Sequence, residues 1–248
     1  MLSVLYLIVL ALAQLACAQD QPVMLYVRPV ATYVPTKGDL FAVSHIIYDS
    51  SAKCSNKSKI CNLADVPQPL AGHGDLADSV SYLRNASLGA NSTGATRKVL
   101  LAVGGPSMDR TCWNNCCNGQ AGAGLAADVL ARMLVKTAKE YGFDGFEIAM
   151  APGSLPIEVT ICTYAADLVQ SLKKQWPHAI ITSSATPVSL SGPNTNYILH
   201  FLTPANADLD YSAVRYYGDS WAAPVTALAA AQSVHFLPVF ATLVKQKH

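Results

Sequence analysis

Short apolar runs alternate with helical patterns along most of the 248 residues, and this alternation restricts the fold more than any other feature. The runs are rich in Val, Ile and Tyr and end in Gly, Pro or Ser, which is typical of strands. They lie at 22–29, 41–48, 97–105, 143–150, 179–187, 209–217 and 234–242. Strands separated by helices predict βαβ units and a parallel sheet.

Three helices are expected between these strands, at 124–142, 156–176 and 221–232. The first ends at Gly142 and the second begins near Pro156, which are favourable residues for those positions. A chain of this size with this pattern folds as a (β/α) barrel or as a doubly wound sheet. Because no strand is followed by a glycine-rich phosphate-binding motif, the sequence gives no support to the nucleotide-binding version of the sheet.

The first 18 residues have the features of a secretory signal peptide. An apolar run extends from Leu2 to Ala13, and Ala16-Cys17-Ala18 follows as a small-x-small cleavage pattern, although no positive residue precedes the run. The run is shorter than the roughly 20 residues that span a bilayer, so a membrane anchor is the weaker alternative. We therefore expect a secreted, extracellular protein with one domain over residues 19–248.

Cysteines and glycosylation sequons agree with secretion. Removal of Cys17 leaves an even number of cysteines, which in a secreted chain favours disulfides. They are Cys54, Cys61, Cys112, Cys116, Cys117 and Cys162. Three disulfides are expected, with Cys54–Cys61 the first choice because both lie in one short polar loop. Cys162 is the least certain, because it lies on the apolar side of a helix. N-glycosylation sequons begin at Asn56, Asn85 and Asn91.

The net charge and the spacing of the histidines indicate which classes of binding partner to expect. The formal net charge is +1, without a basic or acidic run, so we expect neither nucleic acid nor a membrane as partner. The histidines show no metal-ligand spacing, and His45 is expected to be a core or supporting residue. We therefore expect no metal and no cofactor.

Two segments carry a resemblance to a known family. "KVLLAVGG" at 98–105 and "FDGFEIAMA" at 143–151 resemble the paired signatures of family 18 glycoside hydrolases, the chitinases. In that family the third strand ends in Ser-x-Gly-Gly, and the fourth carries Asp-x-x-Asp-x-Asp-x-Glu with the general acid last. "SHIIYDSS" at 44–51 and "LDYSAVRYYGD" at 209–219 resemble its second and sixth strands. The resemblance implies a TIM-type (β/α) barrel, here truncated or lacking the eighth strand.

Departures from the motif imply that catalysis is lost. Asp144 stands at the first Asp of the motif and Glu147 replaces the second. Ala149 replaces the third Asp, Ala151 replaces the catalytic Glu, and Ala102 replaces the Ser of the third strand. Alanine can neither protonate a leaving oxygen nor orient a substrate acetamide. The resemblance therefore implies an inactive homologue without catalytic residues.

The same resemblance implies a carbohydrate-binding set of Asp144, Glu147, Tyr217 and Trp221. Tyr217 takes the position of a tyrosine that contacts the sugar's N-acetyl group, and its alternative is an aromatic plug in the barrel. Trp221 either stacks on sugar or packs at a helix start. The alternative for Glu147, and the favoured one, is a buried acid paired with a neighbour such as Arg215.

Three functions remain open at this point. The first is non-hydrolytic binding of chitin or other N-acetylglucosamine oligosaccharides. The second is a protein partner, with the chain acting as an enzyme inhibitor or storage protein on a chitinase scaffold. The third and weakest is hydrolysis with a relocated acid, because Glu147 lies about 13 Å from the family's acid position at the usual rise of a strand.

Overall fold

The computed structural model describes residues 24–27, 34–40, 43–48, 67–85, 96–104, 113, 126–149, 159–185, 198–205, 207–215 and 236–239. They contain a sheet of seven parallel strands in chain order. The strands are β1 Met24–Val27, β2 His45–Tyr48, β3 Lys98–Gly104, β4 Gly145–Ala149, β5 Ile180–Ala185, β6 Tyr211–Arg215 and β7 Phe236–Val239. Each falls within one of the predicted runs, so the predicted parallel α/β architecture is confirmed.

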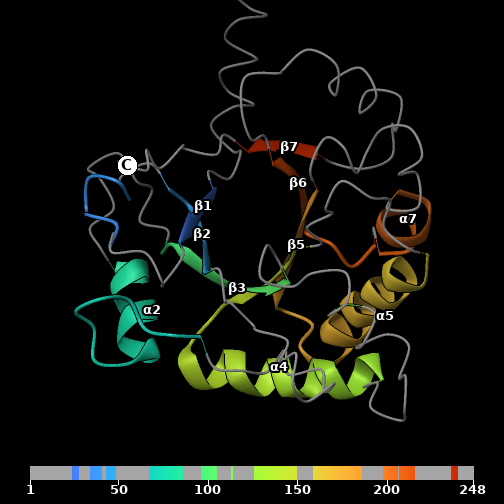
Figure 1. Cartoon of the computed structure of the whole chain (residues 1–248), viewed down its shortest axis with the longest axis horizontal. Coiled ribbons are helices and arrows are strands. Elements are labelled where there is room, and N and C mark those ends of the chain that lie inside the picture. The colour runs from blue at the N-terminus through green and yellow to red at the C-terminus, as the bar shows by residue number, and fades with distance from the viewer. Residues whose placement is uncertain are drawn as a thin grey trace, which may run out of the picture.

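Helices lie outside the ring of strands (Figure 1). They are α2 Leu76–Asn85, α4 Ala127–Tyr141 and α5 Val159–Gln175, followed by the π-helical turn η3 Ile198–Leu202 and the short α7 Thr203–Ala205. The two longest were predicted, and α4 ends at Gly142 with φ of 79°, the left-handed conformation that favours glycine there. The helix predicted at 221–232 lies outside the described residues.

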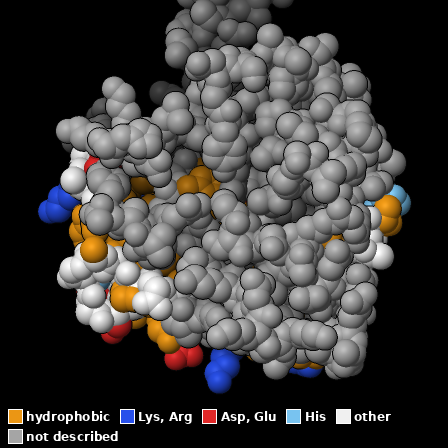
Figure 2. All heavy atoms as spheres, viewed as in Figure 1, with side chains coloured by type: hydrophobic (Ala, Val, Ile, Leu, Met, Phe, Trp, Pro, Cys, Tyr) orange, Lys and Arg blue, Asp and Glu red, His pale blue; other side chains and the backbone are white. Residues whose placement is uncertain are grey.

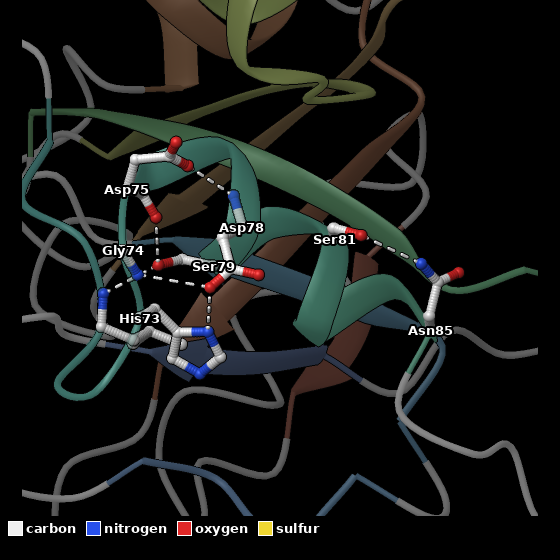
Figure 3. Close-up of polar contacts among 8 residues, drawn as sticks. His73, Gly74, Asp75, Asp78, Ser79, Ser81 and Asn85 are labelled. Carbon is white, nitrogen blue, oxygen red and sulfur yellow. Dashed lines mark hydrogen bonds and ion pairs between the residues drawn. The ribbon is translucent and has the colours of Figure 1, made fainter.

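The sequence patterns did not single out α2. Its buried positions are Leu76, Ser79, Val80 and Leu83, which have helical spacing, but Ser79 interrupts the apolar stripe. Asp75 precedes the first residue of the helix and caps it: its Oδ1 accepts the Asp78 N–H at 2.7 Å, while the Asp78 carboxylate accepts the Gly74 N–H at 3.3 Å (Figure 3). The sequence feature that marks the beginning of α2 is therefore a polar capping residue and not an apolar pattern.

Contacts across the inner side of the sheet show that it is strongly curved. The Tyr26 hydroxyl on β1 donates to Glu147 on β4 at 2.9 Å, although β2 and β3 lie between them in the sheet. The rings of His45 on β2 and Tyr211 on β6 lie 5.7 Å apart. In a flat sheet these two strands would be about 19 Å apart, from a spacing of about 4.8 Å per strand. The strands therefore curve around a common interior, as in a TIM-type barrel (Figure 1).

Alternation along the strands divides the apolar residues into two cores. The inner core lines the barrel interior and contains Met24, Ile47, Leu100 and Ala102, with Tyr26, Ile180 and Tyr211 packed against it. The outer core lies between strands and helices and includes Leu101, Val103, Phe146, Ile148, Leu134, Ile161 and Leu168. Residues on alternate positions of β4, such as Glu147 and Ala149, therefore face the interior.

Two glycines let β3, β4 and β5 approach closely. A Cβ on Gly145 would lie 1.9 Å from the carbonyl oxygen of Ile180 on the neighbouring strand. Gly104, at the end of β3, has φ of 97°, and a Cβ there would lie 2.4 Å from the carbonyl oxygen of Ala149. Only glycine fits either position without a shift of the backbone. These contacts hold β3, β4 and β5 close together, and the paired motif of the resemblance lies on the first two of these strands.

Arg97, which directly precedes β3, is a buried arginine of the outer layer. Its side chain is 1% exposed and donates to three backbone carbonyls, those of Val43 at 3.0 Å, Leu83 at 2.7 Å and Leu40 at 2.7 Å. Burial lowers the pKa of its guanidinium below the usual value. One side chain thus joins the approach to β2, the last turn of α2 and the start of β3.

Charged side chains of the described residues lie at the periphery of the face shown in Figure 2. This agrees with helices that turn their polar sides to solvent and their apolar sides to the sheet. Among the described helices, none has the length and apolar character needed to cross a membrane.

Candidate functional site

Asp144 lies at the amino end of the sheet, directly before β4. Its Oδ2 accepts from Arg84 Nη2 at 2.7 Å and from the Val99 backbone N–H at 2.9 Å. Lys98 Nζ is 3.8 Å from its Oδ1. The carboxylate therefore ties the last turn of α2 and the start of β3 to the start of β4.

Asp210 repeats this arrangement before β6. Its Oδ2 accepts from the Ile181 backbone N–H at 2.7 Å and from Lys173 Nζ on α5 at 2.9 Å. In both places a carboxylate before a strand joins a main-chain N–H of the preceding strand to a cation from a neighbouring helix. In barrels, ligands bind at the opposite, carboxyl ends of the strands. The geometry therefore gives Asp144 a structural role, at the end of the barrel away from the expected carbohydrate site.

Glu147 is a fully buried acid in the barrel interior. Its Oε1 accepts from the Tyr26 hydroxyl at 2.9 Å, and its Oε2 accepts from the hydroxyl of Thr182, its register partner on β5. Each carboxylate oxygen thus accepts a hydrogen bond from an uncharged hydroxyl group. This supports the alternative of a buried acid with a neighbouring partner, with Tyr26 and Thr182 in that role. The side chain of the suggested partner Arg215 lies outside the described ones.

Ala149 lies two residues further on, buried at the carboxyl end of β4. Its register neighbours are Gly104 on β3 and Ser184 on β5. Alternation places Ala149 on the same inner face as Glu147. At the level of the strand ends, where the resemblance expects a carboxylate, β4 therefore presents a methyl group that can neither donate nor accept a proton.

Two buried polar atoms near these strand ends were not singled out by sequence reasoning. Ser184 Oγ and Trp113 Nε1 are buried and make no hydrogen bond with any part of the chain that the structure describes. The Trp113 ring lies close to Gly104, since a Cβ on that glycine would be 2.9 Å from Trp113 Cζ2. The signal for Ser184 was present in the polar run Thr182-Ser183-Ser184, which interrupts an otherwise apolar strand.

His45 is half-buried near the amino ends of the strands, with its ring against that of Tyr211, which fits the supporting role that was one of its two expected roles. Its Nδ1 is 2.9 Å from Ser44 Oγ. Burial and the nearby Lys98 charge lower the pKa of the imidazole, and Asp144 opposes them. Across the described ranges, no three His, Cys, Asp or Glu side chains gather closely enough to hold a metal ion.

Cys162 corrects the disulfide prediction. It is a free, fully buried thiol on α5, so its inclusion among the disulfide-forming cysteines is wrong. The apolar side of the helix packs in the outer core, and burial raises the pKa of the thiol to about 12. Without Cys162, residues 19–248 contain five other cysteines, and the three expected disulfides cannot form within the chain.

Several predicted residues lie outside the described residues. They are Ala151, Tyr217, Trp221, Cys54, Cys61, Cys112, Cys116, Cys117, Asn56 and Asn91. Asn85 is described: it is the exposed last residue of α2, and its Nδ2 donates to Ser81 Oγ at 3.2 Å (Figure 3). Its glycosylation stays a prediction.

Comparison with solved structures supports the barrel fold. No sequence-family profile and no curated protein matches the chain in sequence. Among solved structures, a GH18 chitinase from Pseudoalteromonas aurantia is similar, with a TM-score of 0.63 and 14% identity over 88% of this chain and 79% of that one. An immunomodulatory active chitinase from Trichuris suis has a TM-score of 0.58 and 12% identity, covering 88% of this chain and 65% of that one.

Human YKL-39 is also similar, with a TM-score of 0.51 and 13% identity over 78% of this chain and 50% of that chain. It is described as a pseudo-chitinase with retained chitooligosaccharide binding. At such identities the likeness shows the fold alone. The chain therefore has the (β/α) barrel fold of family 18 chitinases and chitinase-like proteins, over half to four fifths of the length of these solved chains.

Proposed function

We propose that this protein is a secreted, catalytically inactive chitinase-like protein that binds chitin or other N-acetylglucosamine oligosaccharides without cleaving them. The observation that carries the proposal is the inner face of β4. Glu147 has both oxygens engaged, by Tyr26 and Thr182, and Ala149 follows at the strand end.

This inner face supports the proposed loss of hydrolysis. Glycoside cleavage needs a group that protonates the leaving oxygen, and a positioned acid typically contributes 10²–10⁴-fold to the rate. Glu147 is fully buried, two positions below the strand end, so it has no path to a glycosidic oxygen at the carboxyl ends. The sequence places alanine at position 151 as well, where the resemblance expects the acid.

Retained binding is supported by the comparison with YKL-39. That protein, which shares the barrel fold, is described as a pseudo-chitinase that keeps chitooligosaccharide binding. Loss of an acid removes a proton donor but leaves the stacking and hydrogen-bonding surface of a barrel mouth available. Secretion, which the first 18 residues predict, belongs to the same proposal.

Calorimetry with N-acetylglucosamine tetramer and a hydrolysis assay with a fluorogenic chitobioside test the two halves of the proposal together. We expect binding heat and no turnover. Turnover that disappears in Glu147→Ala would refute the inactive assignment. Absence of binding heat with every N-acetylglucosamine oligomer would reject the glycan proposal and favour the protein-partner function.

A further inference from the structure

Ser44 and His45 place an exposed hydroxyl group beside an imidazole at the start of β2. Ser44 directly precedes the strand and is exposed, and its Oγ lies 2.9 Å from His45 Nδ1. The Lys98 N–H donates to the Ser44 carbonyl at 2.9 Å, and His45 is the register partner of Lys98 on β3. The hydroxyl is therefore open to solvent, and the hydrogen bonds of the sheet position it beside the ring.

Three neighbours determine the orientation and the charge of the His45 ring. The Tyr211 ring on β6 contacts it edge-on, with 5.7 Å between the ring centroids. Burial, followed by the nearby Lys98 charge, lowers the pKa of the imidazole, and Asp144 acts in the opposite direction. The imidazole is therefore neutral at pH 7. With its proton on Nε2, it accepts the Ser44 hydroxyl through Nδ1.

This arrangement has the parts of an activated nucleophile. A serine hydroxyl reacts when an adjacent neutral base can take its proton, and the Ser44–His45 distance permits that transfer. Asp144 favours the imidazolium that forms when His45 is protonated, and the positive charge of Lys98 favours an oxyanion that develops near Ser44. The cluster thus contains a nucleophile, a base and charges of both signs for the transition state.

We propose that Ser44 is a nucleophile for carboxylic esters, with His45 as its general base. Ser44 Oγ attacks the ester carbonyl carbon while its proton moves to His45 Nδ1. The tetrahedral oxyanion then collapses, the bond from carbon to the leaving oxygen breaks, and His45 gives the proton to that oxygen. The products are acyl-Ser44 and a free alcohol. The cluster lies at the amino end of the sheet, away from the expected carbohydrate end, so this inference is independent of the proposed function.

A fluorophosphonate probe tests the nucleophile directly, because it forms a stable phosphonyl ester with an activated serine and releases fluoride. The full-length protein is incubated with the probe at about pH 7.5, and peptide mass spectrometry identifies the modified residue. We expect the label on Ser44 and its loss in Ser44→Ala. Ser81→Ala is the matched control, because Ser81 is also exposed but its Oγ accepts from Asn85 Nδ2 instead of bonding to a histidine. Its labelling at Ser44 should equal that of wild type.

The rate of labelling tests the role of His45. His45→Gln keeps a hydrogen-bonding group beside Ser44 but removes the base, so labelling should slow at least about 100-fold, since a positioned base typically contributes 10²–10⁴-fold. In wild type the rate should stay level as the pH falls to 6.5 and decrease only below it, because the pKa of His45 is lowered. Lys98→Met removes the neighbouring charge and should raise the pH at which the decrease begins. A merely structural histidine would produce neither effect.

Two results would overturn the inference: no label on Ser44 in the folded wild type, or a folded His45→Gln protein that is labelled at the wild-type rate. Circular dichroism of each variant shows whether it is folded. If His45→Gln does not fold, the pH profiles of wild type and Lys98→Met decide. A rate that rises in proportion to hydroxide concentration, without a plateau, would then refute His45 as the base.

Discussion

Substitution of Glu147 by alanine should destabilise the barrel strongly without touching the sugar site. The change removes the acceptor of two hydroxyls, those of Tyr26 and Thr182, and leaves a space in a fully buried position. Each buried donor left without a partner costs about 1–3 kcal/mol, and the lost packing adds to this. We expect a loss of about 3–5 kcal/mol of unfolding free energy, a large part of the 5–15 kcal/mol of a typical domain.

Glu147→Gln is the matched control for this prediction. Glutamine keeps the shape and one oxygen acceptor, and hydroxyls can rotate to accept from its amide, so the loss should be about 1–2 kcal/mol. Urea unfolding followed by tryptophan fluorescence measures both losses. Hydrogen exchange should also show faster opening of β1, because Tyr26 is its link to β4. A loss below about 1 kcal/mol for Glu147→Ala would refute the interpretation of Glu147 as a structural tie.

Three further predictions concern the rest of the structure. Arg97→Met should lower the unfolding free energy by about 3–5 kcal/mol, because three buried carbonyls lose their donor, whereas the exposed Arg132→Met should change it by less than about 0.5 kcal/mol in the same urea titration. Cys162, with a pKa of about 12, should react with iodoacetamide at pH 8 only after denaturation, and mass spectrometry that finds it alkylated in the folded protein would contradict its burial. Because the pKa of His45 is lowered in the folded state, the unfolded chain binds its proton first as the pH falls below about 6.5, so stability should decrease over that range. His45→Gln should show a shallower decrease in thermal melts between pH 7 and pH 5, and an identical slope would contradict this.

The strands and the two long helices were predictable because each is encoded by a local pattern. Apolar runs bounded by Gly, Pro or Ser marked β1 to β7, and Gly142 marked the end of α4. The short α2 was missed because Ser79 occupies a buried position on its inner side. There its hydroxyl accepts the Leu70 N–H and donates to the Asp75 carbonyl, which a hydropathy pattern does not reveal.

The hydrogen-bond partners of Glu147 were less predictable, because they depend on the curvature of the sheet. Tyr26 lies 121 residues before Glu147 and Thr182 lies 35 residues after it. Only a strongly curved sheet brings the first of these across the interior. Sequence reasoning named both Glu147 and Asp144 as carbohydrate contacts because they belong to one motif, and favoured a buried acid as the alternative for Glu147 alone.

The paired carboxylates before β4 and β6 have a consequence for protein engineering. Asp144 secures the strand by its amino end, and Ala149 stands at the other end of the same strand, so the requirements of folding and of chemistry are separated along its length. Residues at 149 and 151 can then be exchanged for carboxylates, in an attempt to install hydrolysis, while the anchoring of β4 stays untouched. A barrel built in this way offers a strand whose carboxyl end can be redesigned while its amino end holds the strand in place.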